Sequence, residues 1–297
     1  MPELEDYLAE RRKLVNQTLD RLLPPADMYP RLLHEAIRYS VFAGGKRLRP
    51  ILAIAAAEAV GGEVEGILPV AAALECIHTY SLIHDDLPSM DDDDFRRGKP
   101  TCHKVYGEAL AILAGDALLT LAFELLSQGA ITQHMDAQRL SVLIQEIARA
   151  AGSSGMVGGQ SVDILSEGKE IDQETLLYLH THKTGALIQV SVIAGGLVAG
   201  ASEEQIGALS RYGERIGLAF QIVDDLLDVT STTEELGKPA KSDLKHAKAT
   251  FPALMGKETS MKEVERLTAE AKEVLRPFEG RAWALHAIAG YLTSRRF

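Results

Sequence analysis

The sequence has few of the residues that mark several common classes of protein. It contains only two cysteines, Cys76 and Cys102, and no Cys-x-x-Cys pair, so we expect no disulfide framework and a reducing, cytoplasmic location. Aromatic residues make up 5% of the 297 residues, and alternation of apolar and polar residues over a strand length is hard to find. The first twenty residues are charged throughout, which argues against a secretory signal there.

Long apolar runs and linkers are also scarce. The longest nearly apolar run, 186–201, includes Gln189 and a Gly195–Gly196 pair and is shorter than the roughly 20 residues that a bilayer span requires. We therefore expect a buried core helix there and no membrane span. No linker, low-complexity tract or fixed-period repeat divides the chain, so we predict a single domain over residues 1–297.

Most of the sequence shows helical periodicity. One predicted helix places six residues on a single face: Leu32, Leu33, Ala36, Ile37, Ser40 and Val41. The stretches 51–60 and 70–83 are apolar nearly all round, which is typical of helices at the centre of a large bundle. We predict an all-α fold of about ten helices.

The charge balance limits the function and raises a conflict. The formal net charge is −11, from 31 basic and 42 acidic residues, which argues against a general nucleic-acid binder. The same balance is unfavourable for an anionic substrate, unless bound metal ions and local bases reverse the sign at the site.

Six aspartates within ten residues form the first acidic cluster, in HDDLPSMDDDDFRRG. The preceding stretch is predicted to be helical and to end near Pro88, which places Asp85 and Asp86 at a helix C-terminus, where cations are favoured. Hard carboxylate oxygens suit Mg²⁺, which also bridges to phosphates. An acidic run alone is usually a solvated loop. Because Arg96 and Arg97 follow at once, however, metal and phosphate ligands stand side by side.

The second acidic cluster lies in AFQIVDDLLDVT. Gln221, Asp224, Asp225 and Asp228 follow the spacing i, i+3, i+4, i+7, so they share one side of a predicted helix whose other residues are apolar. Carboxylates in such a helix are costly unless they are paired or bound to a metal. The alternative is a surface helix with an acidic stripe.

Basic residues supply candidates for holding a diphosphate. Lys46, Arg47 and Arg49 follow a Gly pair in GGKRLRP, which lacks the nucleotide P-loop pattern but suits diphosphate oxygens. An ordinary basic turn is the alternative. His78 lies two turns before Asp85 and has a second interpretation as a core histidine with satisfied hydrogen bonds.

Taken in order, the motifs GGKRLRP, DDLPSMD, RRG, GMVGGQ, HKTGALI, DDLLD and LGK resemble those of the trans-type isoprenyl diphosphate synthases over nearly the whole chain. The resemblance implies a helical bundle around a central cavity, Mg²⁺ as cofactor, isopentenyl and allylic diphosphates as substrates, and a homodimer. It implies that the allylic diphosphate ionises, that its cation alkylates isopentenyl diphosphate, and that a proton is then lost.

The resemblance also assigns roles residue by residue. The Mg²⁺ ligands would be Asp85, Asp86 and Asp91, faced by Asp224, Asp225 and Asp228. The allylic diphosphate would be contacted by Arg96, Lys183 and Lys238. The isopentenyl diphosphate pocket would contain Lys46, Arg49, His78 and Arg97. The allylic cation would be faced by Thr184 and Gln221. Lys248 matches least well, because Ala249 separates it from Thr250.

Product length is predicted from the helix before the first acidic cluster. Tyr80 lies five residues before Asp85, about 7–8 Å deeper along the axis, and with Ser81 would close the product cavity. The resemblance then predicts a fifteen-carbon farnesyl product. The alternatives are a geranylgeranyl product, a terpene cyclase or head-to-head coupling enzyme with the same fold, and a regulatory subunit without activity.

Overall fold

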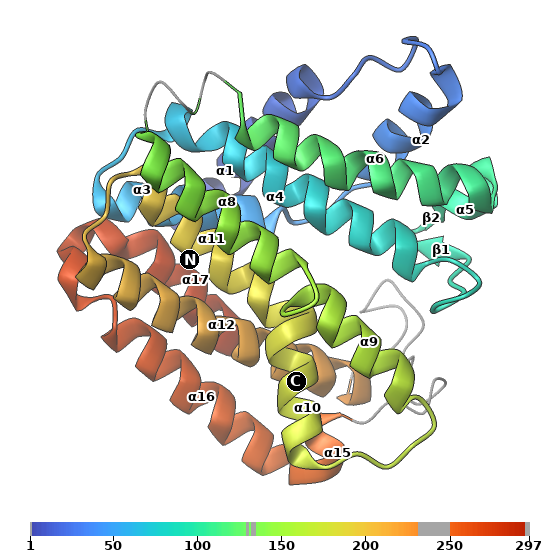
Figure 1. The fold of residues 1–297 in the computed structure, drawn as a ribbon. Helices are drawn as coiled ribbons and strands as arrows, with labels where there is room; N and C mark the ends of the chain where they lie inside the picture. The colour runs from blue at the N-terminus through green and yellow to red at the C-terminus, as the bar shows by residue number, and fades with distance from the viewer. Residues whose placement is uncertain (1, 129–130, 132–134, 231–249, 295–297) are drawn as a thin grey trace. The chain divides into compact units, whose positions relative to one another are not determined.

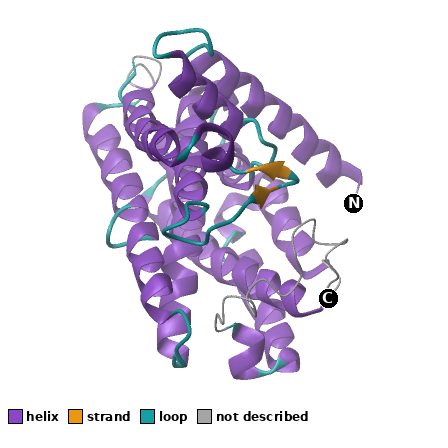
Figure 2. Ribbon diagram, turned by 90° about the vertical axis from the view of Figure 1, so that its right-hand side faces the viewer, coloured by secondary structure: helices purple, strands orange, loops and turns teal. Residues whose placement is uncertain are grey.

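The computed structural model describes residues 2–128, 131, 135–230 and 250–294, which are almost entirely helical (Figure 1; Figure 2). The chain divides into two compact units, one of Met1–Ile51 and Glu65–Ala137 and the other of Leu52–Val64 and Gln138–Phe297. The prediction of an all-α fold is confirmed, since one two-stranded hairpin is the only sheet within the described ranges. The prediction of a single domain stays a prediction.

The first unit holds the N-terminal helices and the hairpin. Its helices are α1 (Pro2–Leu22), α2 (Arg31–Val41), the start of α3 (Leu48–Val60), most of α4 (Val64–Asp85), α5 (Cys102–Tyr106) and α6 (Glu108–Leu126). Between α4 and α5, strands β1 (Phe95–Arg96) and β2 (Lys99–Pro100) pair antiparallel, with Arg96 opposite Lys99. Helices α2, α5 and α6 contact one another.

Helix α2 buries half of the face that its periodicity predicted. Ala36 and Ile37 are buried, and so is Val41 about one turn further along. Leu32, which the same pattern assigned to this face, lies in the first turn and is 57% exposed. The apolar stripe therefore begins to contact the core only from the second turn of the helix.

Helix α4 positions the first acidic cluster. Every residue from Ile67 to Ile77 is buried, which confirms that this helix is apolar nearly all round and lies in the core. The helix ends at Asp85, so the aspartates begin where the buried stretch stops. Because the stretch before it is buried on all sides, packing fixes the direction in which the last turn of α4 reaches the aspartates.

Two helices of the first unit are long and apolar enough to cross a membrane by length and composition alone, contrary to what the 186–201 run suggested. Helix α4 is 78% buried over its apolar window, as expected for a core helix. Helix α6 is 39% buried there, and Ile112 and Leu113 on it are exposed. The absence of a membrane span stays a prediction.

The second unit holds the remaining helices. They are α8 (Ala137–Ala151), α9 (Met156–Ser166), α10 (Gln173–Leu179), a π-helix (His180–Gly185), α11 (Ala186–Val198), α12 (Glu203–Thr230), α15 (Phe251–Met255), α16 (Lys257–Glu273), a 3₁₀ segment (Arg276–Ala282) and α17 (Trp283–Ser294). Helix α12 contacts α11, α16 and the π-helix, and is the longest of those described.

The buried helix predicted over 186–201 is confirmed as α11. Its glycine pair has a structural reason: a Cβ on Gly195 would lie 2.1 Å from the carbonyl oxygen of Ala53 in α3. A Cβ on Gly196 would lie 2.6 Å from a methyl group of Leu209 in α12. Glycine at both positions lets α11 approach its neighbours closely.

Candidate active site

The first acidic cluster is gathered at the C-terminal end of α4. The backbone N–H of Asp91 donates to the carbonyl oxygen of Asp85 at 2.9 Å, and that of Asp92 donates to Leu87 at 3.1 Å. These hydrogen bonds fold the loop back onto the last turn of the helix, so the backbones of two predicted Mg²⁺ ligands, Asp85 and Asp91, lie side by side. The negative end of the helix dipole adds to the attraction for a cation there.

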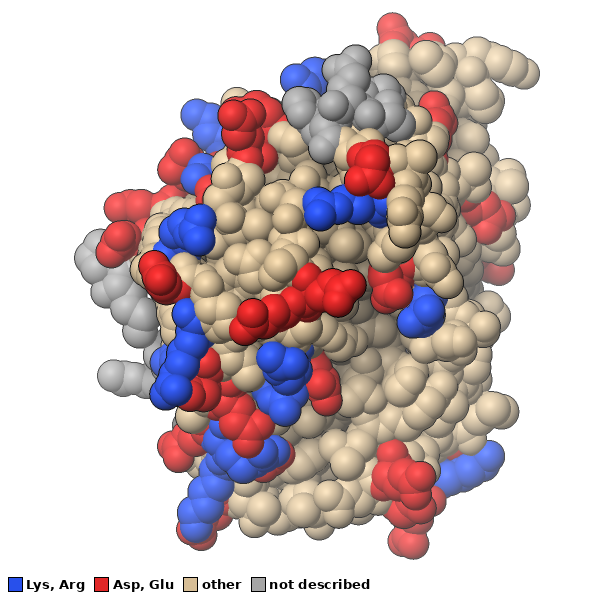
Figure 3. All heavy atoms as spheres, turned by 60° about the vertical axis from the view of Figure 1, so that its left-hand side comes forward, with Lys and Arg blue, Asp and Glu red and all other residues tan. Residues whose placement is uncertain are grey.

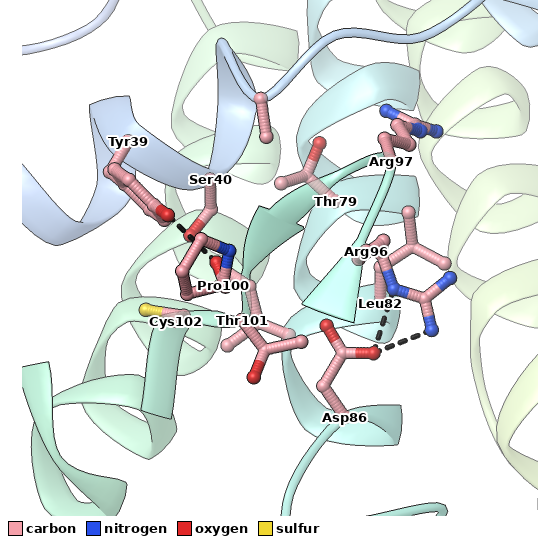
Figure 4. A pocket seen from close by; sticks show the side chains of 12 residues that line it. Tyr39, Ser40, Thr79, Leu82, Asp86, Arg96, Arg97, Pro100, Thr101 and Cys102 are labelled. Atoms are coloured by element: carbon pink, nitrogen blue, oxygen red, sulfur yellow. Dashed lines mark hydrogen bonds and ion pairs between the residues drawn. The ribbon is translucent and has the colours of Figure 1, made fainter. Parts of the chain in front are cut away.

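Asp86, the third predicted ligand of this cluster, is buried and paired with Arg96. Asp86 Oδ1 accepts a hydrogen bond from Arg96 Nε at 2.7 Å and lies 2.5 Å from Arg96 Nη2 (Figure 4). Only 4% of Asp86 is exposed. Burial raises the pKa of the Asp86 carboxyl above its ordinary value, although the Arg96 hydrogen bond opposes that rise. Arg96, predicted to contact the allylic diphosphate, is therefore held in place by a neighbouring predicted metal ligand.

A pocket lies behind this pair, lined by residues from α2, α4, the hairpin and the start of α5 (Figure 4). It encloses about 420 Å³ of empty space, including part that is open to solvent. Tyr39 closes one side by donating its hydroxyl to the carbonyl oxygen of Pro100 at 2.7 Å. Sequence patterns gave no signal for Tyr39, Ser40 or Cys102 in this lining, since each belongs to an element without a site motif.

The basic loop and the RRG hairpin come together in the first unit. Arg97 Nη1 donates to the carbonyl oxygen of Gly44, and a Cβ on Gly45 would lie 2.5 Å from that same nitrogen. Gly45 also has a φ of +135°, which side-chain-bearing residues rarely adopt. Gly45 of GGKRLRP therefore makes room for Arg97.

His78 lies among these arginines. Burial and the positive charges of Arg49 and Arg97, followed by Arg96 and Arg47, hold its pKa well below 6.5, so the imidazole is neutral at neutral pH. The structure thus brings together three residues predicted for the isopentenyl diphosphate pocket. The fourth, Lys46, is exposed and adjoins Gly45.

The second unit places Lys183 and Thr184 in the π-helix between α10 and α11. Such segments are rare and are found frequently at functional sites. Lys183 Nζ donates to Asp163 Oδ2 at 2.6 Å, a partner that no sequence motif indicated. The motif GMVGGQ needs a glycine at position 159, because a Cβ there would lie 2.2 Å from the backbone nitrogen of Lys183.

The second acidic cluster lies on α12, as predicted, but its members have different surroundings. Asp225 is 4% exposed and Asp228 is 2% exposed, while Gln221 and Asp224 are partly buried. Asp225 accepts hydrogen bonds from Gln221 Nε2 at 3.2 Å and from the backbone N–H of Phe251 at 2.8 Å.

Asp225 also lies beside His180, whose Nε2 is 3.3 Å from Asp225 Oδ2. The carboxylate thus connects α12 to the start of the π-helix and to the start of α15. His180 belongs to no spacing typical of metal ligands, so no pattern in the sequence indicated it, and the structure identifies it as a neighbour of the second cluster. The catalytic role predicted for Asp225 stays a prediction.

Lys238 and Lys248, predicted to contact substrate, lie outside the described residues.

Charge on the face drawn in Figure 3 is mixed: among the described residues there, Lys and Arg lie interspersed with Asp and Glu.

Mg²⁺ fits the donor chemistry of the first cluster. Asp85 and Asp91 supply hard oxygen ligands at one helix end, and Mg²⁺ needs only one or two carboxylates beside water and substrate phosphates. Within the described ranges, no three His, Cys, Asp or Glu side chains form a group that could hold a metal ion. An Mg²⁺ ion held by these two carboxylates would take its remaining ligands from water and from the substrate phosphates.

The helical fold, the two aspartate clusters and the arginines around His78 are the features that an enzyme acting on diphosphates requires. The sequence model of the polyprenyl synthetase family matches residues 30–276, and the chain belongs to this family of prenyltransferases. The predicted resemblance to the trans-type isoprenyl diphosphate synthases is confirmed at the level of the family.

Individual relatives cover nearly the whole chain. A geranylgeranyl diphosphate synthase from Cyanophora paradoxa is 50% identical over 290 residues, which are 97% of this chain and 95% of that protein. The solved structure of a geranylgeranyl pyrophosphate synthetase from Pyrococcus horikoshii has a TM-score of 0.90 at 32% identity, covering 99% of each chain. An FPP/GFPP synthase from Zymomonas mobilis has a TM-score of 0.87 at 38% identity, covering 98% of this chain and 99% of that one.

Proposed function

We propose that this prenyltransferase condenses isopentenyl diphosphate with allylic diphosphates, head to tail, and that its main product is geranylgeranyl diphosphate. The 50% identity to a geranylgeranyl diphosphate synthase over 97% of the chain carries the choice of product. This replaces the farnesyl product predicted from Tyr80 and Ser81, although solved relatives at lower identity include an FPP/GFPP synthase.

In the proposed reaction, the first unit holds the isopentenyl diphosphate. Arg49 and Arg97 offer planar forks that match diphosphate oxygens, and Lys46 adds a mobile point charge. Neutral His78 can donate one ring N–H without further positive charge. Together they orient the double bond that is alkylated, which lowers the entropic part of the barrier.

The allylic diphosphate is assigned to the acidic clusters and to Lys183. When bound, Mg²⁺ supplies positive charge that stabilises the departing diphosphate. Arg96 and Lys183 add cationic hydrogen-bond donors, which gain strength as charge develops on the leaving oxygen. Thr184 and Gln221 offer neutral oxygen atoms to the allylic carbon, which becomes positive.

One experiment tests both the reaction and the product. Purified protein is incubated with isopentenyl diphosphate and, separately, dimethylallyl, geranyl and farnesyl diphosphates, with Mg²⁺ or with excess chelator, and the products are sized. We expect a twenty-carbon product that requires Mg²⁺. A fifteen-carbon end product would restore the farnesyl assignment, and a cyclic hydrocarbon would show a terpene cyclase. No condensation with any of the three starters would refute the proposed reaction.

The homodimer and the cytoplasmic location remain proposals. The exposed Ile112 and Leu113 of α6 are apolar side chains available to an interface. Light scattering coupled to size exclusion measures the mass directly, and the 32.2 kDa of one chain is the result that would exclude a dimer.

A further inference from the structure

The GGKRLRP segment runs from the loop after α2 into the first turn of α3 and carries three bases, of which the structure turns the middle one inward. Arg47 is 4% exposed, whereas Lys46 is exposed and Arg49 is partly buried. Arg47 also has a φ of +55°, a left-handed conformation that is unfavourable for a residue with a Cβ. Contacts made by its side chain must compensate for this backbone conformation.

Those contacts come from three different helices. Arg47 Nη1 donates to Glu75 Oε1 of α4 at 2.6 Å, and Nε donates to Asn16 Oδ1 of α1 at 2.9 Å. Nη2 donates to the carbonyl oxygen of Val41, the last residue of α2, at 2.6 Å. Only a planar guanidinium offers donors in these three directions at once, so one side chain ties the loop to α1, α2 and α4.

The buried pair adjoins residues that are assigned to isopentenyl diphosphate, since Arg47 follows Lys46 in the chain. Glu75 is 2% exposed and precedes His78 by one turn on the same face of α4. Burial is the main cause that lowers the pKa of Arg97. The negative charge of Glu75 raises the pKa of Arg97, and the positive charge of Arg47 lowers it. Glu75 and Arg47 are thus within electrostatic reach of a guanidinium assigned to the substrate.

We infer that Arg47 and Glu75 form a buried positioning pair. The pair fixes the backbone of the GGKRLRP segment, so that Lys46 and Arg49 on either side of Arg47 are held where they bind isopentenyl diphosphate. Arg47 itself does not contact the substrate. This inference rests on the proposed function, because it assigns a supporting role to residues beneath one of its two substrate sites.

The fork of Arg47 can be tested without removing its charge. Arg47→Lys keeps a cation, but a single ammonium group cannot reach all three acceptors. The backbone of the loop is then no longer held in one position. We expect the KM for isopentenyl diphosphate to rise at least tenfold, while kcat and the KM for the allylic substrate stay within threefold. Arg31→Lys, at an exposed pair with Glu35, is the matched control and should leave all three unchanged.

Asn16→Ala removes the single hydrogen bond that Asn16 accepts from Arg47 and leaves every side chain assigned to the substrate in place. It should raise the same KM several-fold and leave the allylic KM unchanged. Gln17→Ala, at the exposed neighbouring position, is its control and should have no effect. If Asn16→Ala and Arg47→Lys both match their controls, the positioning role is wrong.

A third variant separates positioning from stability. Buried ion pairs can be replaced by apolar residues of similar size with little loss of stability. The double variant Arg47→Met with Glu75→Leu should therefore melt near the wild-type temperature and still show a raised KM for isopentenyl diphosphate. A double variant that regains both the melting temperature and the wild-type KM would show that the pair only stabilises the fold. If it does not fold, Arg47→Lys and Asn16→Ala decide.

Calorimetric titration with isopentenyl diphosphate alone makes the test independent of turnover. A chain that binds this ligand but forms no product contradicts the proposed function, and the ranking of wild type, Asn16→Ala and Arg47→Lys by affinity still tests the inference. A tenfold loss of affinity corresponds to about 1.4 kcal/mol. Equal affinities for wild type and Arg47→Lys would overturn the inference whatever the turnover.

Discussion

Gly159→Ala tests whether close backbone contact between α9 and the π-helix positions Lys183. A Cβ at this position would lie 2.2 Å from Lys183 N, 2.7 Å from Lys183 Cα and 2.9 Å from His182 C. All three are backbone atoms, so no side-chain rotation relieves the overlap. Because ordinary contact begins near 3.4 Å, the two segments must separate by about 1 Å.

The magnitude follows from that displacement. Overpacking by one methyl group in a close contact typically costs about 1–3 kcal/mol. In a chain of this size each kcal/mol lowers Tm by about 2–4 °C, so we expect a loss of several degrees. A misplacement of about 1 Å in a substrate-binding group can cost up to about 10²-fold in rate, so kcat/KM for the allylic substrate should fall by about 10–100-fold.

Gly207→Ala is the matched control, because it introduces the same methyl group inside helix α12. Its nearest neighbour would be Arg211 Nη1 at 3.5 Å, and the exchange gains about 0.8–1 kcal/mol of helix propensity. Steady-state kinetics at 25 °C and thermal melting are measured for both variants. A Gly159→Ala enzyme with the Tm of wild type and kcat/KM within twofold of it would refute the reasoning.

Three further predictions concern the other site residues. Tyr80→Ala, which removes a ring that is 6% exposed, should leave the proposed twenty-carbon product unchanged, because that product replaces the one in which Tyr80 closes the cavity; a longer product by chromatography would show that Tyr80 limits chain length after all. Asp225→Asn should lower stability by about 1–3 kcal/mol in urea unfolding, because the amide keeps one acceptor oxygen and places a donor NH2 group against the second N–H donor; an unchanged midpoint would contradict this. In the folded protein the pKa of His78 lies well below 6.5, its ordinary value in an unfolded chain. As pH falls below 6.5, only the unfolded state therefore binds a proton at His78. The free energy of unfolding should then fall by up to about 1.4 kcal/mol per pH unit. His78→Gln should remove that slope between pH 6.5 and 5.5, and an identical slope in the variant would count against a neutral buried imidazole.

The sequence predicted the elements that carry the site better than the contacts within it. Helix α4 could be predicted because its apolar run is long and the aspartates begin where Asp85 ends it. The position of α12 followed from the spacing of Gln221 and its three aspartates. Both are local signals, read from the period of the helix.

Contacts between distant segments left no such signal. Gly159 and Lys183 are far apart in sequence, and nothing in GMVGGQ indicates which backbone approaches it. The π-helix has no period that distinguishes it from an α-helix over six residues. Arg47 and Arg49 are the same residue type two positions apart, and only the left-handed backbone at Arg47 turns it toward the core.

The conflict between an acidic chain and an anionic substrate is resolved locally rather than by the metal alone. The chain carries −11 overall, yet the pKa of His78 is lowered by burial and by four arginines, which is the sign of a positive local potential. Opposite charge gathers separately, at the end of α4. If overall charge governed binding, neutralising surface carboxylates would lower the KM for isopentenyl diphosphate. If the local arrangement governs binding, Asn16→Ala, which changes no charge, should alter that KM more than such surface changes do.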